Sequence, residues 1–265
     1  MGRFKSLELE QGQNSPAESG FSASEENCSF GEGVKGADDF LREAVEAVGL
    51  CEFEKALRLF ARVLSFDNKN KTAWFGQIRC LLYLDEYKEA LMWADKAIEA
   101  VGEGSELLAA KSCAYCRMGD FSRAYGLSDV SMEMKGTGPF VWLCRGEILL
   151  QQKKKNYTFC FDQALTVPSE SAWQILIEIA RVLMFYGKAA GALPYLETAK
   201  EKAPSQALVW YELGNCYADM GMKNNALEAY GHAEELNPEM AVVKDAVKGV
   251  RNTGVISNLK RRMFG

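Results

Sequence analysis

An apolar residue recurs at every 34th position along most of this 265-residue chain. The recurring positions are Phe40, Trp74, Leu108, Trp142, Leu176 and Trp210. Between them, apolar residues are spaced three and four apart in stretches of about a dozen, which predicts pairs of amphipathic helices. A fixed period of this length is typical of stacked helical repeats, in which each helical pair is one unit. The sequence therefore predicts an all-α fold.

The clearest unit lies near the end of the chain and carries a recognisable signature. Its residues are Trp210, Leu213, Gly214, Tyr217, Ala226, Tyr230 and Pro238. Their spacing resembles the tetratricopeptide repeat, whose pattern is W-x2-L-G-x2-Y, then A-x3-F, then P, with Tyr230 in place of the phenylalanine. This resemblance implies a right-handed α-solenoid of stacked helix-turn-helix repeats, whose small and aromatic signature residues pack between helices.

The same frame, carried back through the chain, predicts six repeats without an inserted residue. Their bounds are about 37–70, 71–104, 105–138, 139–172, 173–206 and 207–240. Residues 1–36 are rich in Ser, Gly and Glu and poor in apolar residues, so we expect a disordered arm there. Residues 241–265 begin with AVVKDAVKGV, which has one apolar face, so we expect a C-terminal capping helix and a basic tail.

Two of the units depart from the regular pattern. In the fourth, Phe161 and Ala164 lie one residue early relative to the frame, so we expect a remodelled turn over residues 151–156. In the fifth, Pro194 falls within the expected second helix. Because proline removes one backbone hydrogen bond and clashes with the preceding turn, this helix is predicted to start late or to bend.

Composition and charge argue against several classes of function. The net charge of −5 provides no positive field for nucleic acid. Eight scattered cysteines are typical of reduced thiols, and the chain has neither a membrane-spanning apolar stretch nor a signal-peptide core, so a cytoplasmic location is expected. The chain has one histidine and lacks the phosphate-loop, zinc-protease and nucleophile-elbow motifs, so neither an enzyme nor a cofactor is expected.

The resemblance also implies where a partner binds, because the first helices of such repeats line a concave groove that holds an extended peptide or a helix. Carried over position by position, the partner-binding groove residues expected here are Arg42, Phe75, Arg79, Cys113, Phe140, Glu147, Arg181, Tyr211 and Asn215. No run of three first helices supplies the Lys and Asn with which some members hold the C-terminal carboxylate of heat-shock chaperones. We therefore expect a protein interaction scaffold or adaptor that binds a more apolar peptide or helix, with its partner and oligomeric state left open.

Two other functions and one further surface stay open from the sequence. The start MGRFKS fits the pattern for myristoylation of Gly2, which would make the protein a membrane-tethered adaptor, although a single acyl chain binds membranes only marginally. Cys113, Cys116 and Cys144 could form a thiol-based metal or redox site, or could pack between helices. The run Lys153–Lys155 is either a solvated turn or a patch for an acidic partner.

Overall fold

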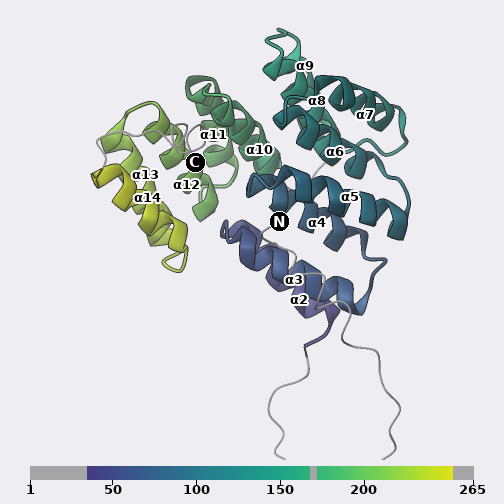
Figure 1. Ribbon diagram of the computed structural model, residues 1–265. Helices are drawn as coiled ribbons and strands as arrows, with labels where there is room; N and C mark the ends of the chain where they lie inside the picture. Colours follow the sequence, from purple (N-terminus) through teal and green to yellow (C-terminus); the bar gives the residue numbers. More distant parts are fainter. Residues whose placement is uncertain (1–34, 168–171, 253–265) are drawn as a thin grey trace, which may run out of the picture. The chain divides into compact units, whose positions relative to one another are not determined.

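The computed structural model describes residues 35–167 and 172–252 of the chain (Figure 1). Within these ranges the secondary structure is thirteen α-helices and no strand. The helices are α2 (Ala37–Gly49), α3 (Phe53–Phe66), α4 (Lys71–Tyr83), α5 (Tyr87–Val101), α6 (Ser105–Arg117), α7 (Phe121–Glu133), α8 (Pro139–Gln151), α9 (Tyr157–Thr166), α10 (Ala172–Phe185), α11 (Ala189–Lys202), α12 (Ala207–Asp219), α13 (Lys223–Leu236) and α14 (Ala241–Asn252). The predicted arm up to residue 34, the acylation motif at Gly2 and the predicted tail from residue 253 lie outside the described residues.

The helices form successive pairs joined by short turns. The two helices pack against each other in each of the pairs α4–α5, α6–α7, α8–α9, α10–α11 and α12–α13, and Phe40 of α2 stacks on Phe66 of α3. The fold is therefore an all-α helical-repeat solenoid, as predicted. The described residues form two compact units: unit 1 comprises 35–48 and 53–102, and unit 2 comprises 49–52, 103–167 and 172–252.

The turn inside each helical pair repeats its backbone conformation every 34 residues. A positive φ occurs at Cys51 (58°), Asp85 (60°), Gly119 (82°), Lys153 (56°), Gly187 (70°) and Gly221 (80°). A left-handed residue directly after a helix is a common way for the chain to stop the helix and reverse. Glycine adopts this conformation without steric cost, whereas other side chains are strained in it. The 34-residue step is therefore present in the backbone as well as in the apolar residues.

Replacing Gly119 with alanine is expected to lower the free energy of unfolding by about 1 kcal/mol, because alanine is strained in the left-handed region. No atom lies within 4 Å of the added Cβ, so backbone strain is the main new cost. Urea denaturation followed by circular dichroism measures the change. The matched control is Gly126→Ala inside α7, which also has open space around its Cβ and should raise stability by up to about 1 kcal/mol. A Gly119→Ala variant as stable as this control would contradict the prediction.

Small residues on the first helices let aromatic side chains of the second helices pack closely. Gly146 of α8 faces the ring of Phe161 on α9, and Gly214 of α12 faces the ring of Tyr230 on α13. In both cases an added Cβ would lie closer than 3.0 Å to the ring. Phe161 and Tyr230 are buried. These signature residues therefore hold each helical pair together, as expected from the sequence.

The two predicted irregularities have different outcomes. The turn of the fourth pair is remodelled, as predicted. The neighbouring second helices α7 and α11 begin at Phe121 and Ala189, so the 34-residue step places the start of α9 at position 155. This helix instead begins at Tyr157, two residues later. The late start predicted for α11 is wrong, since this helix begins in frame at Ala189 and runs through Pro194. Proline removes a single backbone hydrogen bond there, and the buried side chain of Leu196 helps to hold the helix against the core.

The last described helix, α14, packs one face against α13. Val243 is buried in this contact, and Ala246, Val247 and Val250 are partly buried against the same cluster. Lys248 on the other face is exposed. An amphipathic helix in this position covers apolar surface that α13 would otherwise leave in water. Among the helices in the described ranges, none combines the length and the apolar character needed to cross a membrane.

Candidate functional site

The predicted groove residue Glu147 lies at the centre of a buried hydrogen-bond network in unit 2. Its side chain, on α8, is 2% exposed. Arg117 of α6 donates from Nε to Oε1 over 2.7 Å and from Nη2 to Oε2 over 3.3 Å. Cys113 of α6 and Tyr186, which follows α10, donate to the same carboxylate over 3.2 and 3.0 Å. One carboxylate thus links three consecutive first helices.

Burial strengthens the interactions around this carboxylate. The guanidinium of Arg117 lies 4.7 Å from the centre of the Phe185 ring, which adds a cation–π contact to the ion pair. Desolvation, and after it the charge of Glu147, raises the pKa of Tyr186 well above its ordinary value. The Tyr186 hydroxyl therefore stays protonated and is available as a donor to the carboxylate.

A second network of the same kind surrounds Arg181 and Glu212, which are also in unit 2. Arg181 of α10 donates from Nε to Oε1 of Glu212 on α12 over 2.7 Å, and from Nη1 to Glu178 over 3.3 Å. Asn215 donates to the other oxygen of Glu212 over 3.2 Å and accepts from the hydroxyl of Tyr230 over 2.8 Å. An ion pair again joins neighbouring first helices.

The predicted groove residues of unit 1 make contacts within their own helices. Arg79 of α4 donates to the hydroxyl of Tyr83 over 2.6 Å, and its guanidinium lies 5.7 Å from the centre of the Phe75 ring. Arg42 of α2 pairs with Asp39 over 2.7 Å, and its side chain is 73% exposed. Arg42 is therefore on open surface, whereas Arg79 and Phe75 form a half-buried pair.

Two predicted groove residues of unit 2 are half-buried aromatics. Phe140 lies in the first turn of α8. Tyr211 of α12 places its ring centre 6.0 Å from that of Tyr230. Desolvation, and after it the charge of Glu212, raises the pKa of Tyr211 above its ordinary value. Both rings keep part of their surface in water.

The structure brings together some of the residues that the sequence placed on one face. Cys113 contacts Glu147, and Arg181 is joined to Asn215 through Glu212. In the sequence these residues recur at a single position of the repeat, 34 apart. The observed contacts are therefore contacts between helices of neighbouring pairs, and one of them places Arg181 against the oppositely charged Glu212.

Two members of the Glu147 network are missing from the set predicted by sequence. Arg117 follows Cys113 by four residues and so lies on the same helical face, which is a signal that the sequence contains. Tyr186 follows the last residue of α10, and no spacing within a helix would have placed its hydroxyl on Glu147. A search for oppositely charged residues about 30 positions apart on successive first helices would have found the ion pair, although not the tyrosine.

The thiols of Cys113, Cys116 and Cys144 are buried and reduced. Desolvation raises the pKa of both Cys116 and Cys144 above the ordinary value, so these thiols stay protonated at neutral pH. Since thiolates are the form that attacks electrophiles and binds metals, this environment opposes a metal or redox role. In the part of the chain that the structure describes, no group of three or more His, Cys, Asp or Glu side chains is placed to hold a metal ion.

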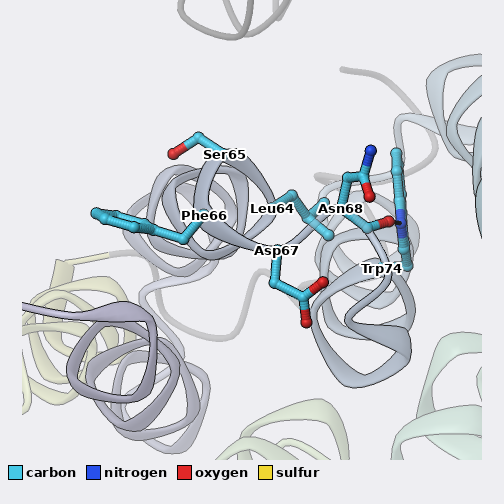
Figure 2. A pocket seen from close by; sticks show the side chains of 6 residues that line it. All are labelled: Leu64, Ser65, Phe66, Asp67, Asn68 and Trp74. Carbon is cyan, nitrogen blue, oxygen red and sulfur yellow. Dashed lines mark hydrogen bonds between the residues drawn. The ribbon is translucent and has the colours of Figure 1, made fainter. Parts of the chain in front are cut away.

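A pocket of about 460 Å³ lies where α3 leads into α4 in unit 1 (Figure 2). Its lining residues are Leu64, Ser65, Phe66, Asp67, Asn68 and Trp74. Figure 2 shows the Phe66 ring pointing away from Trp74, with the Asp67 carboxylate lying between them. The Trp74 indole donates to the Asn68 carbonyl over 2.9 Å, just as Trp210 donates to the carbonyl six residues before it over 2.8 Å. This wall of the pocket is therefore part of the repeat packing, and the lining includes none of the predicted groove residues.

Comparisons with known proteins found similar family models and a similar curated protein. Models of the tetratricopeptide repeat match residues 41–105 and 207–240. A relative described as TPR repeat-containing protein MJ1428, from Methanocaldococcus jannaschii, is 24% identical over 196 residues. The match covers 69% of this chain and 34% of that protein, so the chain spans about a third of the relative's length.

Two solved structures with similar helical arrangements are described as tetratricopeptide repeat proteins. One, from Parabacteroides merdae, has 18% sequence identity and a TM-score of 0.48, with 82% of this chain and 84% of that chain covered. Another, TTC0263 from Thermus thermophilus, has 17% identity and a TM-score of 0.45, with 82% and 99% covered.

Proposed function

Since the chain is a tetratricopeptide repeat protein, we propose that it is a protein–protein interaction scaffold that binds a peptide or helix of a partner on the face formed by its first helices. Proteins of this family are generally scaffolds and not enzymes. We also propose the division into six repeats between residues 37 and 240, which the recurrence of a positive φ at every 34th residue supports.

The observation that carries the proposal is a set of half-buried aromatic side chains at groove positions. Phe75 of α4, Phe140 of α8 and Tyr211 of α12 each keep part of their ring exposed. Phe75 and Tyr211 occupy the same position of the repeat, separated by four steps of 34 residues. Partly exposed aromatic residues contribute most of the binding free energy at many interfaces, because they bury large apolar area with little loss of side-chain entropy.

The ion pairs of unit 2 support the same interpretation of the partner. Arg117 pairs with Glu147 and Arg181 with Glu212, so the charges of these four side chains are compensated within the protein. A partner that binds through one terminal carboxylate would have to compete with Glu147 or Glu212 for an arginine. A peptide or helix with apolar anchor residues, which leaves the ion pairs intact, fits this face better.

The test is to replace Phe75, Phe140 and Tyr211 together with alanine. The partner is first captured from the native cell with the unaltered protein and identified, and its affinity for each variant is then measured by calorimetry. The triple variant is expected to bind about a hundredfold more weakly or worse, since each anchor is worth roughly 1 to 2 kcal/mol. The matched control is Phe159→Ala, an exposed aromatic on a second helix, which should leave affinity unchanged. Full affinity in a triple variant with an unchanged thermal melt would rule out this face.

A further inference from the structure

The turn between α8 and α9 presents three lysines to solvent. Lys153, Lys154 and Lys155 are all exposed, and α9 begins two residues later than the repeat frame requires. The backbone of the turn is held by two hydrogen bonds, from the N–H of Lys153 to the carbonyl of Leu150 and from the N–H of Lys154 to the carbonyl of Leu149, both 2.9 Å. The lysines are therefore carried on a fixed turn.

An aromatic side chain of the neighbouring pair anchors the middle lysine. Lys154 donates from Nζ to the hydroxyl of Tyr125 on α7 over 3.0 Å, and its Nζ lies 4.8 Å from the centre of the Tyr125 ring. The guanidinium of Arg145 on α8 lies 4.9 Å from the same ring. The Tyr125 hydroxyl in turn donates to Oε1 of Gln152 over 3.1 Å. Two cations thus share one ring, which holds positive charge in a defined place.

A second tyrosine with a cation lies on the same small apolar cluster. Tyr115 and Tyr125 both pack against Cys116, Ala124 and Ile148, where α6, α7 and α8 meet. Arg123 lies 4.5 Å from the Tyr115 ring centre, and its side chain is 65% exposed. The four helices α6 to α9 lie side by side in unit 2 (Figure 1). The cations are gathered around two tyrosines that pack on one apolar cluster. We call the set Arg123, Arg145 and Lys153–Lys155 the basic edge.

The charges of the basic edge are only partly compensated. Arg123 pairs with Asp120 over 2.6 Å and Arg145 with Asp129 over 2.7 Å. Within the described residues, the three lysines of the turn form no ion pair with a carboxylate. The edge therefore has an excess of positive charge on a protein whose net charge is −5.

We propose that the basic edge is a second docking site, separate from the groove face, and that it binds an acidic segment of a protein partner. Charge complementarity selects the occupant, because three ammonium groups carried on one turn, with that of Lys154 held against Tyr125, suit a short run of Asp or Glu. A nucleic acid would extend its phosphates beyond the turn onto a protein of negative net charge, which disfavours it. The site uses Arg123 of the second helix α7, Arg145 of α8 and the α8–α9 turn, and it shares no residue with the predicted groove.

The test uses the full chain and a fluorescein-labelled peptide of six glutamates, with a peptide of six glutamines for comparison. Binding is measured by fluorescence anisotropy at low and high salt. The variant Lys153→Glu/Lys155→Glu reverses two exposed charges and keeps the Lys154–Tyr125 contact. We expect it to bind hexaglutamate about tenfold more weakly or worse, and we expect added salt to weaken binding by the unaltered protein.

The matched control is Lys202→Glu/Lys244→Glu, which makes the same change in net charge at two exposed lysines elsewhere in unit 2. It should bind hexaglutamate within about twofold of the unaltered protein, since charges far from the site are screened. Equal weakening in both variants would overturn the proposal, as would failure of the unaltered protein to bind hexaglutamate in preference to hexaglutamine. Tighter binding of oligothymidylate than of hexaglutamate, lost in the Lys153→Glu/Lys155→Glu variant, would also overturn it and indicate a nucleic-acid site.

Discussion

Replacement of Glu147 with alanine is expected to lower the free energy of unfolding by about 3 to 5 kcal/mol, because it leaves the buried guanidinium of Arg117 without its carboxylate. The side chains of Arg117 and Glu147 are 11% and 2% exposed, so water cannot fully replace the lost partner. The substitution also removes the acceptor of the Cys113 and Tyr186 donors. Urea denaturation of the full chain, followed by circular dichroism, measures the loss.

Two further variants separate the buried ion pair from other causes. Arg117→Met with Glu147→Leu removes both charges and fills their space with apolar atoms, so it should recover most of the lost stability. Asp245→Ala removes the carboxylate of an exposed pair with Lys248, and the unfolding midpoint should stay close to that of the unaltered protein. If Glu147→Ala is no less stable than Asp245→Ala, the network does not contribute as the structure indicates.

Gly214→Ala is expected to lower the free energy of unfolding by about 2 to 3 kcal/mol, because the new Cβ overlaps the ring of Tyr230. The added atom would lie closer than 3.0 Å to two ring carbons. Tyr230 is 1% exposed, and its hydroxyl donates to Asn215, so the ring has little freedom to move away. The loss is read from the same urea denaturation, and Gly146→Ala should behave alike because its Cβ would overlap Phe161.

The control for this prediction lies on the partner helix. Gly231 of α13 is next to Tyr230 in the chain, and nothing lies within 4 Å of an added Cβ. Gly231→Ala should therefore raise the free energy of unfolding by up to about 1 kcal/mol through helix propensity alone. In the double variant Gly214→Ala/Tyr230→Leu, the smaller side chain should couple favourably with the alanine. A Gly214→Ala variant as stable as Gly231→Ala would contradict the prediction, because it would show that α12 and α13 can move apart with little loss of stability.

The close approach of Gly214 and Tyr230 is a contact that the sequence alone predicts. Both residues belong to a signature with fixed spacing, and the helices that carry them follow from apolar periodicity. Of the two outcomes predicted at Pro194, the late start is wrong, because a helix held by the core tolerates the loss of one backbone hydrogen bond. Local sequence patterns predicted the helices, whereas tertiary packing decided whether a helix continues through an unfavourable residue such as Pro194.

The candidate site was predicted less completely than the fold. The sequence predicts the repeat position of Glu147 and Arg181, and the resemblance to the repeat family implies that they contact a partner. The structure instead places each of them in an ion pair with a neighbouring first helix. The proposal that a partner binds in the groove is therefore supported by the half-buried aromatic residues, of which Phe75 and Tyr211 lie at the same position of the repeat.

By itself, the sequence determined that this chain forms paired helices with a 34-residue step, because helical periodicity and turn chemistry act over a few residues. Only the tertiary structure decided which charges meet, as Arg117 and Glu147 are 30 residues apart and their distance depends on how two helices stack. It also decided that Lys154 is anchored on Tyr125, which holds one charge of the lysine run in a defined place. Contacts of this kind depend on side-chain geometry between repeats, and a one-dimensional pattern does not contain that geometry.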